Sequence, residues 1–396
     1  MTSKYLLPAA LVILCATCTG GSTGGSAGEP MDMASDPTVA DGSMAPIFEV
    51  DPFWPKPLPN HWLLGSTIGL GVDSRDHVWI IHRGNLGNNE IPAALDPPAA
   101  EECCFAAPPV VEFDAEGNVV GSWGGPGMGY DWPTSNHGIV VDHMDNVWIG
   151  GNGAGDSHVL KFSRAGDFLM QVGESGHDVD SNARNHFSRV AKVTFDGAAN
   201  EMYLADGYGN KRVAVIDATS GDLKRFWGAY GNVPSDDNLG DYDPTMATQQ
   251  FRGPVHCADP SNDNLVYVCD RGSDRVQVFQ TDGTFVNEIF IERATRGAGA
   301  VWDVAFSPDP AQTFMYVVDG MNEKIHVVRR EGLEYVYNFG DGGRTPGQFY
   351  GAHSIATDSH GNIFTTETYE GKRVQKHLYR GMGPAPSGST GVARPD

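Results

Sequence analysis

Three histidines stand at the same point of three similar segments and could bind one metal ion. The segments read N-H-G-I-V-V-D at 136–142, V-H-C-A-D at 255–259 and A-H-S-I-A-T-D at 352–358. Imidazole is a preferred zinc ligand, and catalytic zinc commonly keeps three protein ligands and one open position for water or substrate. A lone histidine there would ordinarily bond only to water and backbone. A shared site therefore requires a fold that brings the three segments together.

The segments belong to a repeat that runs through most of the chain, with a period of about 40 residues. The copy at 137–173 reads as four short strands, with a D-x-x-x-N turn after the first and an A-G-D turn after the third. Four antiparallel strands in one repeat form one blade of a β-propeller. The other copies begin near Gly65, Arg189, Gly253, Ala300 and Gly351. The sequence thus predicts an all-β, six-bladed propeller.

The last repeat lacks a convincing fourth strand after Val374. The segment I-F-E-V-D-P-F-W at 47–54 could supply that strand. Pairing it beside the last blade would close the ring and leave no free sheet edge. We therefore predict one propeller domain over 47–380, followed by a flexible tail at 381–396.

Register within the repeat predicts where the histidines lie. The second strands of the six repeats end at His82, Gly151, Asp206, Asp270, Asp319 and Glu367. Counting back fourteen residues in repeats two, four and six gives His137, His256 and His353. The same count, with an insertion allowed in repeat five, gives Ile68, Lys192 and Asp303 in the others. Inner strands line the channel of a propeller, so histidines on alternate blades predict a three-imidazole zinc site.

Three polar side chains are expected on the same face as the histidines. In an antiparallel hairpin the start of the first strand and the end of the second share one edge. Arg83, Tyr208 and Arg271 each follow a second strand. An arginine can hold a carboxylate in bidentate fashion, and nearby positive charge lowers the pKa of a phenol. This set favours an anionic substrate and a proton transfer by Tyr208, although either arginine alone could serve only in a surface ion pair.

The composition excludes one class of partner. Of 396 residues, 50 are Asp or Glu and 27 are Lys or Arg, giving a formal charge of −23. No basic tract interrupts this excess, so we expect no nucleic-acid partner. A small molecule or peptide that carries a carboxylate is the expected ligand, and the oligomeric state stays open.

The N-terminal residues predict export. Residues 1–18 hold one lysine and an apolar run from Leu6 to Ala16, which is typical of a signal peptide and too short for a stable membrane span. Cys18, followed by T-G-G-S-T-G-G-S, is a candidate for lipidation, with simple cleavage as the alternative. The Gly- and Ser-rich residues 19–46 indicate a disordered linker. The protein is expected in the periplasm, on the outer surface as a lipoprotein, or secreted.

Export permits disulfides between the remaining cysteines. Cys257 and Cys269 are symmetric about Asp263, within the turn-like P-S-N-D-N, so they would face each other across a hairpin. We predict that they form a bridge. Cys103 and Cys104 lie in an insertion at 85–108, where a vicinal bridge, a thiol pair and metal binding are all open and a structural role is favoured.

The motifs together resemble those of the NHL-type six-bladed propellers, and among these the peptidyl-α-hydroxyglycine α-amidating lyases. The resemblance includes H-R-G at 82–84, N-H-F at 185–187, D-G-Y-x-N-x-R at 206–212, D-R-x-x-x-R-V-Q-x-F at 270–279 and F-V-x-E-I at 285–289, along with the three histidine segments. Each motif is short, and their shared order and spacing make the resemblance specific.

The resemblance implies roles for the site residues. His137, His256 and His353 would bind zinc, Tyr208 would act as base, and Arg83 and Arg271 would assist it and hold a substrate carboxylate. Ser354 stands where the family has an aspartate tied to a structural calcium ion, and Gly209 replaces a family disulfide cysteine. Both positions depart from the family pattern. The resemblance itself implies a structural calcium ion as a second candidate cofactor.

The leading function implied is a zinc-dependent lyase. It would cleave the N–C bond of an N-acyl- or peptidyl-α-hydroxyglycine, a carbinolamide, to give an amide and glyoxylate. One alternative is a non-catalytic extracellular propeller that binds peptide or protein on the same face. The other is a metal-dependent lactone or ester hydrolase, in which the open metal position would hold water.

Overall fold

The computed structural model describes residues 44–84, 86 and 103–386, which form an all-β structure. The chain divides into a unit of residues 1–35 and a unit of residues 36–396, and every described residue lies in the second. The signal segment, Cys18 and most of the linker and of the 85–108 insertion lie outside the described residues. Within the described ranges, the helical segments are three single 3-10 turns, and none has the length or apolar character to span a bilayer.

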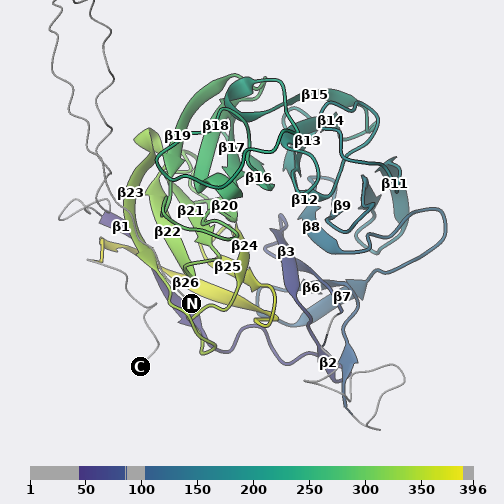
Figure 1. Ribbon diagram of the computed structural model, residues 1–396. Helices are drawn as coiled ribbons and strands as arrows, with labels where there is room; N and C mark the ends of the chain where they lie inside the picture. The colour runs from purple at the N-terminus through teal and green to yellow at the C-terminus, as the bar shows by residue number, and fades with distance from the viewer. Residues whose placement is uncertain (1–43, 85, 87–102, 387–396) are drawn as a thin grey trace, which may run out of the picture. The chain divides into compact units, whose positions relative to one another are not determined.

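Six four-stranded antiparallel sheets follow one another around a ring, as Figure 1 shows for the strands labelled β3 to β26. Blade one contains β3 (Thr67–Val72), β4 (Val78–His82), β6 (Val110–Phe113) and β7 (Val119–Trp123). Blade two contains β8 (Asn136–Val141), β9 (Val147–Gly151), β10 (His158–Phe162) and β11 (Phe168–Gly173). Blade three contains β12 (Val190–Asp196), β13 (Glu201–Asp206), β14 (Arg212–Asp217) and β15 (Leu223–Trp227).

The second half of the ring has the same plan. Blade four contains β16 (Val255–Pro260), β17 (Leu265–Asp270), β18 (Arg275–Gln280) and β19 (Phe285–Phe290). Blade five contains β20 (Asp303–Phe306), β21 (Phe314–Asp319), β22 (Lys324–Arg329) and β23 (Glu334–Phe339). The inner strand of each blade contacts the inner strand of the next, and the last of them, β24 (Ala352–Thr357), contacts β3. The predicted six-bladed propeller is confirmed.

Blade six is completed by the N-terminal strand. Its own strands are β24, β25 (Ile363–Glu367) and β26 (Arg373–Pro384), and β1 (Met44–Asp51) pairs antiparallel with β26 (Figure 1). Closure of the ring by an N-terminal strand is thus confirmed. The strand begins at Met44 and ends at Asp51 instead of covering 47–54, and β26 extends to Pro384, into the expected tail. The difference arises because Met44 pairs with Pro384 at the far end of the same ladder.

The second strand of each blade has the strongest apolar character. Every residue of β4, β13 and β21 is buried, whereas the outer strand β11 has no buried residue. A strand inside a sheet, with neighbouring blades on both faces, needs apolar side chains pointing both ways. Burial is therefore greatest in the second strand and falls toward the outer strand, which faces solvent.

The D-x-x-x-N turn fixes the inner hairpin of a blade. In blade two, Asp142 accepts hydrogen bonds from the Asn146 N–H at 2.9 Å and from Trp148 Nε1 at 3.0 Å. Blade one repeats the second contact, with Trp79 Nε1 donating to Asp73 at 3.0 Å. One carboxylate thus closes the turn and anchors the indole of the following strand, which is why the turn motif marks each such blade in the sequence.

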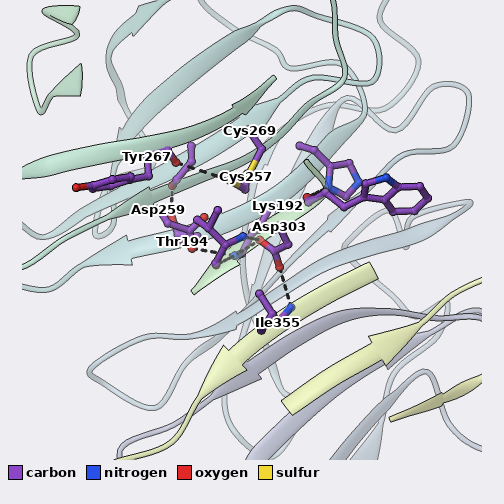
Figure 2. Close-up of a disulfide and its surroundings, with 12 residues drawn as sticks. Lys192, Thr194, Cys257, Asp259, Tyr267, Cys269, Asp303 and Ile355 are labelled. Atoms are coloured by element: carbon purple, nitrogen blue, oxygen red, sulfur yellow. Dashed lines mark hydrogen bonds and ion pairs between the residues drawn. A yellow bond between two sulfur atoms is a disulfide. The ribbon is translucent and has the colours of Figure 1, made fainter. Parts of the chain in front are cut away.

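The predicted disulfide is present. Cys257 and Cys269 are directly paired across β16 and β17, their Cα atoms lie 4.8 Å apart, and their sulfur atoms are bonded (Figure 2). Cys103 and Cys104 are also bonded to each other. Both bridges fit a protein that matures in an oxidising compartment.

Candidate metal centre

The structure brings the three sequence-predicted histidines together. His137, His256 and His353 lie on the inner strands β8, β16 and β24, and all three are buried. Their ring centroids are 5.1, 4.8 and 4.9 Å apart, which is close to an equilateral triangle. One ligand nitrogen from each ring lies within 4.8 Å of the other two. These three imidazoles form a group that could hold a metal ion.

A β-bulge aims each imidazole. The pairing register of the inner strand shifts between Asn136 and Ile139, between Val255 and Cys257, and again between Ala352 and Ile355. Each histidine is part of the extra stretch that this shift creates. A bulge leaves one residue outside the ladder and re-aims its side chain, so the imidazoles converge although their blades are 120° apart.

Backbone carbonyls of the neighbouring blades orient the rings. The Nδ1 atoms of His137, His256 and His353 lie at hydrogen-bonding distance from the carbonyls of Ala191, Trp302 and Ile68. A carbonyl only accepts, so each Nδ1 carries the proton and each Nε2 keeps its lone pair. This is the tautomer that binds a metal through Nε2, with the carbonyl as the supporting partner.

These contacts correct the register expected for blades three and five. Val190 pairs with Asp206 and Lys192 with Ala205, so Ala191 is the bulged residue of blade three. Asp303 pairs with Val318, and Trp302 is the residue that meets His256. Lys192 and Asp303 therefore lie one residue beyond the positions equivalent to the histidines, because the first hairpins of blades three and five are longer than those in which the count succeeds. Thr67 pairs with His82 in blade one, fifteen positions later, whereas Val190 pairs with Asp206 in blade three, sixteen positions later.

The protonation state of the three rings fits metal binding. Burial, followed by the charges of Arg271 and Arg83, lowers the pKa of His353 to about 3. Burial also lowers the pKa of His137 and His256 well below the ordinary value. The imidazoles are therefore neutral over the physiological range, which is the form a metal requires. Three converging neutral imidazoles match the ligand set of an open zinc site.

Tyr208 lies beside the triangle, in contact with two of its three histidines. Its hydroxyl is 3.1 Å from His137 Nε2 and 3.1 Å from His256 Nε2, and it accepts a hydrogen bond from Arg271 Nη1 at 2.9 Å. Burial raises the pKa of Tyr208 above its ordinary value, against the opposing charges of Arg271 and Arg83. The expectation that the arginines lower this pKa was wrong in net effect, because desolvation of the phenolate outweighs them.

Arg271 and Arg83 are held in place by different contacts. Arg271, in the single turn η3 (Arg271–Ser273), is 9% exposed, and its guanidinium lies 4.6 Å from the ring centre of Trp302. Arg83 is partly buried and donates from Nε to the Asn136 carbonyl at 3.2 Å and from Nη2 to Asn152 at 2.9 Å. Arg271 thus contacts Tyr208 directly, whereas Arg83 is held beside the site by blade two.

Sequence reasoning missed two aromatic residues of this site. Trp302 is buried, with its ring 5.4 Å from His353 and 6.0 Å from His256. Tyr369 is 55% exposed, and its ring lies 6.2 Å from that of Trp302. Trp302 immediately precedes the counted position Asp303, so correct bulge placement would have found it. No motif in the sequence indicates Tyr369.

A buried ion cluster lies farther along the inner strands. Lys192 Nζ donates to Asp259 at 2.8 Å and to Asp303 at 2.5 Å, and Asp303 also accepts from the Ile355 N–H at 3.1 Å (Figure 2). Burial raises the pKa of Asp259 to about 7, with Lys192 opposing the shift and Asp303 adding to it. The Lys192 ammonium group of blade three thus pairs with carboxylates of blades four and five, and Asp303 also accepts a backbone hydrogen bond from blade six.

Comparisons with known proteins agree with this architecture. The family model described as Lactonase, 7-bladed beta-propeller matches residues 231–339, a part of the chain that runs through blades four and five of the six. A structural genomics protein of unknown function from Bacteroides thetaiotaomicron VPI-5482 has a similar fold, with a TM-score of 0.52 at 15% identity over 86% of this chain and 77% of that chain.

Two curated relatives are similar to most of the chain at low identity. Peptidyl-alpha-hydroxyglycine alpha-amidating lyase 1 of Drosophila melanogaster is 23% identical over 354 residues, 83% of this chain and 59% of the relative. NHL repeat-containing protein 3 of Mus musculus is 26% identical over 284 residues, 69% of this chain and 65% of the relative. The chain thus matches less than two thirds of either relative's length. The resemblance to amidating lyases and NHL-repeat propellers is confirmed at low identity.

Proposed function

We propose that this protein is a zinc-dependent lyase that converts an N-acyl- or peptidyl-α-hydroxyglycine into an amide and glyoxylate. The observation that carries the proposal is the contact of one phenol with two metal-competent imidazoles and a guanidinium. Tyr208 makes that contact with His137, His256 and Arg271. The similarity to an amidating lyase of Drosophila melanogaster supports the same reaction class.

The metal-binding histidines and Tyr208 would have different roles in the reaction. Zinc bound at the three Nε2 atoms would polarise the substrate hydroxyl as a Lewis acid. Tyr208 removes the hydroxyl proton as the C–O bond becomes a carbonyl and the C–N bond breaks. The proton then passes to the departing amide nitrogen, so the products are neutral amide and glyoxylate.

The arginines stabilise negative charge at two points. Arg271 donates to the Tyr208 oxygen at 2.9 Å and so favours its deprotonated form. Burial raises the pKa of Tyr208, and a cation held by His137, His256 and His353 would add a further positive charge that favours the phenolate. Arg83, which donates to Asn136 and Asn152, would hold the substrate carboxylate.

A glyoxylate-release assay on an N-acyl-α-hydroxyglycine tests the proposal. The purified protein is stripped of metal, reloaded with zinc, and assayed beside the stripped form. We expect release that depends on zinc and is lost in Tyr208→Phe. Zinc binding without any release from the parent would overturn the lyase.

The family-model match favours a second candidate, a metal-dependent lactone or ester hydrolase. The same imidazoles would then hold a zinc-bound water as the nucleophile. A panel of lactones and aryl esters, assayed with the zinc-loaded protein, separates this reading from the lyase. Absence of both activities would leave peptide or protein binding as the function.

We also propose that the protein is exported and tethered through a lipidated Cys18, where it meets small or peptide substrates that carry a carboxylate. The two disulfides support an oxidising compartment. Membrane fractionation of the parent and of Cys18→Ala tests the tether. Equal recovery of both in the soluble exported fraction would contradict it.

A further inference from the structure

A cavity separate from the metal centre opens on the histidine face of the propeller, beside Arg271. Its volume is about 490 Å³, and it is lined by three loops: residues 240–242 and 252–253 before β16, Gly272 after β17, and 295–299 before β20. Loops that precede first strands and follow second strands share the edge where the histidines lie. The cavity is therefore on the same face as the metal centre.

The backbone of Arg271 and Gly272 connects this cavity to the metal centre. The Arg271 N–H donates to the Pro254 carbonyl at 3.2 Å, two residues before His256. A side chain at Gly299 would collide with the Arg271 carbonyl, and one at Gly272 with the Gly253 carbonyl. These glycines keep the loops packed on Arg271. Three extended residues span at most about 10–11 Å, so Gly253, in the cavity wall, lies no farther than this from His256.

The cavity is rich in positive charge although the chain carries a net −23. Two guanidiniums, those of Arg252 and Arg296, line it against the single carboxylate of Asp241. The side chains that line the cavity therefore carry an excess of positive charge, opposite in sign to the charge of the whole molecule.

The two arginines have unused hydrogen-bonding capacity. Arg252 donates from Nη1 to the Gly240 carbonyl at 2.6 Å and lies 5.5 Å from the Tyr242 ring centre, but its buried Nε has no partner. Arg296 is exposed and makes no hydrogen bond or ion pair with any residue that the structure describes. Arg252 is thus held in position by its neighbours, and Arg296 is free to close on a ligand.

We propose that this cavity is a subsite for an acidic residue of a peptide substrate, within the last three residues before the hydroxyglycine. The inference rests on the proposed lyase function, because the reacting end of the peptide is taken to lie at Tyr208. The peptide passes over Arg271, and the acidic side chain pairs with Arg296 and Arg252. An arginine fork matches a carboxylate in geometry as well as charge.

The test compares two substrates that differ in one group, acetyl-Glu-Ala-α-hydroxyglycine and acetyl-Gln-Ala-α-hydroxyglycine. We expect the zinc-loaded parent to prefer the Glu peptide by about threefold to fivefold in kcat/KM, the upper part of the range for an exposed charge pair. Arg296→Gln should reduce the preference below about twofold by lowering kcat/KM for the Glu peptide. Arg75→Gln is the control variant. Arg75 is exposed and follows the first strand of blade one, at the edge of the sheet opposite the histidines, so its replacement should keep the parent's preference for the Glu peptide.

Calorimetry with unreactive peptides separates the subsite from the reaction. Acetyl-Glu-Ala-Gly and acetyl-Gln-Ala-Gly lack the hydroxyl group and test binding alone. Tighter binding of the Glu peptide, lost in Arg296→Gln, would support the subsite even if the parent released no glyoxylate, in which case only the lyase fails. Glyoxylate release with equal kcat/KM for both substrates would overturn the subsite and leave the lyase intact. Equal binding and no release would overturn both.

Discussion

Replacing His256 with alanine should remove most of the protein's zinc affinity while leaving the propeller folded. Four-ligand zinc sites bind with about 10–16 kcal/mol, so one ligand contributes about 3–4 kcal/mol, or roughly 10²–10³-fold in Kd. The three rings are nearly equivalent, with centroids 4.8 to 5.1 Å apart, so each should contribute a similar share. Calorimetric titration of the stripped protein with zinc, against a competing chelator, measures the change.

His143→Ala is the matched control for this experiment. His143 is exposed and stacks on Phe195 at 4.8 Å, at the turn of blade two and outside the triangle, so its loss should leave zinc affinity unchanged. Circular dichroism establishes that both variants are folded. If folded His256→Ala bound zinc within twofold of the parent, the three-imidazole site would be wrong.

Three other variants test separate parts of the structure. Tyr208→Phe should keep zinc but lose at least about 10²-fold in kcat, because general base catalysis typically contributes 10²–10⁴-fold, and near-parent glyoxylate release would remove Tyr208 from the mechanism. Phe48→Ala should lower the free energy of unfolding by about 3–5 kcal/mol in a denaturant titration, since Phe48 is 4% exposed and lies 5.4 Å from Phe339, and an unchanged midpoint would contradict closure through β1. Asp259→Asn should flatten the pH dependence of stability between pH 4 and 7. Because burial raises the pKa of Asp259 to about 7, the folded parent keeps a proton that the unfolded chain releases in this window, and its free energy of unfolding falls as the pH rises. Equal slopes for parent and variant would refute that assignment.

The histidine triangle could be predicted from the sequence because the repeat shows which residues occupy equivalent positions in different blades. The second strands end at clear positions, and the count from Gly151, Asp270 and Glu367 led to the correct residues. The same count failed at Lys192 and Asp303. The first hairpin of blade three is one residue longer than that of blade one, and the first hairpin of blade five is longer still, and nothing in the local sequence marks these extra residues.

The electrostatic character of the site could not be read from residue types. Arg271 contacts Tyr208 as expected, yet burial, which depends on the packing of six blades, decides the direction of the phenol's pKa. The arginine-lined cavity was also missed. Its walls come from the long loops at 240–253 and 295–299, which lie outside the repeat and carry no motif.

The pairing of β1 with β26 also governs how the ring can assemble. Its two strands come from opposite ends of the described chain, so this is the contact with the greatest sequence separation in the propeller. Contacts of high separation form slowly, because the chain must first give up the entropy of a long loop. During synthesis the edge of β1 stays unpaired until the final blade emerges, and an unpaired edge invites association with other chains. Assembly of this protein is therefore most vulnerable just before its last strand arrives.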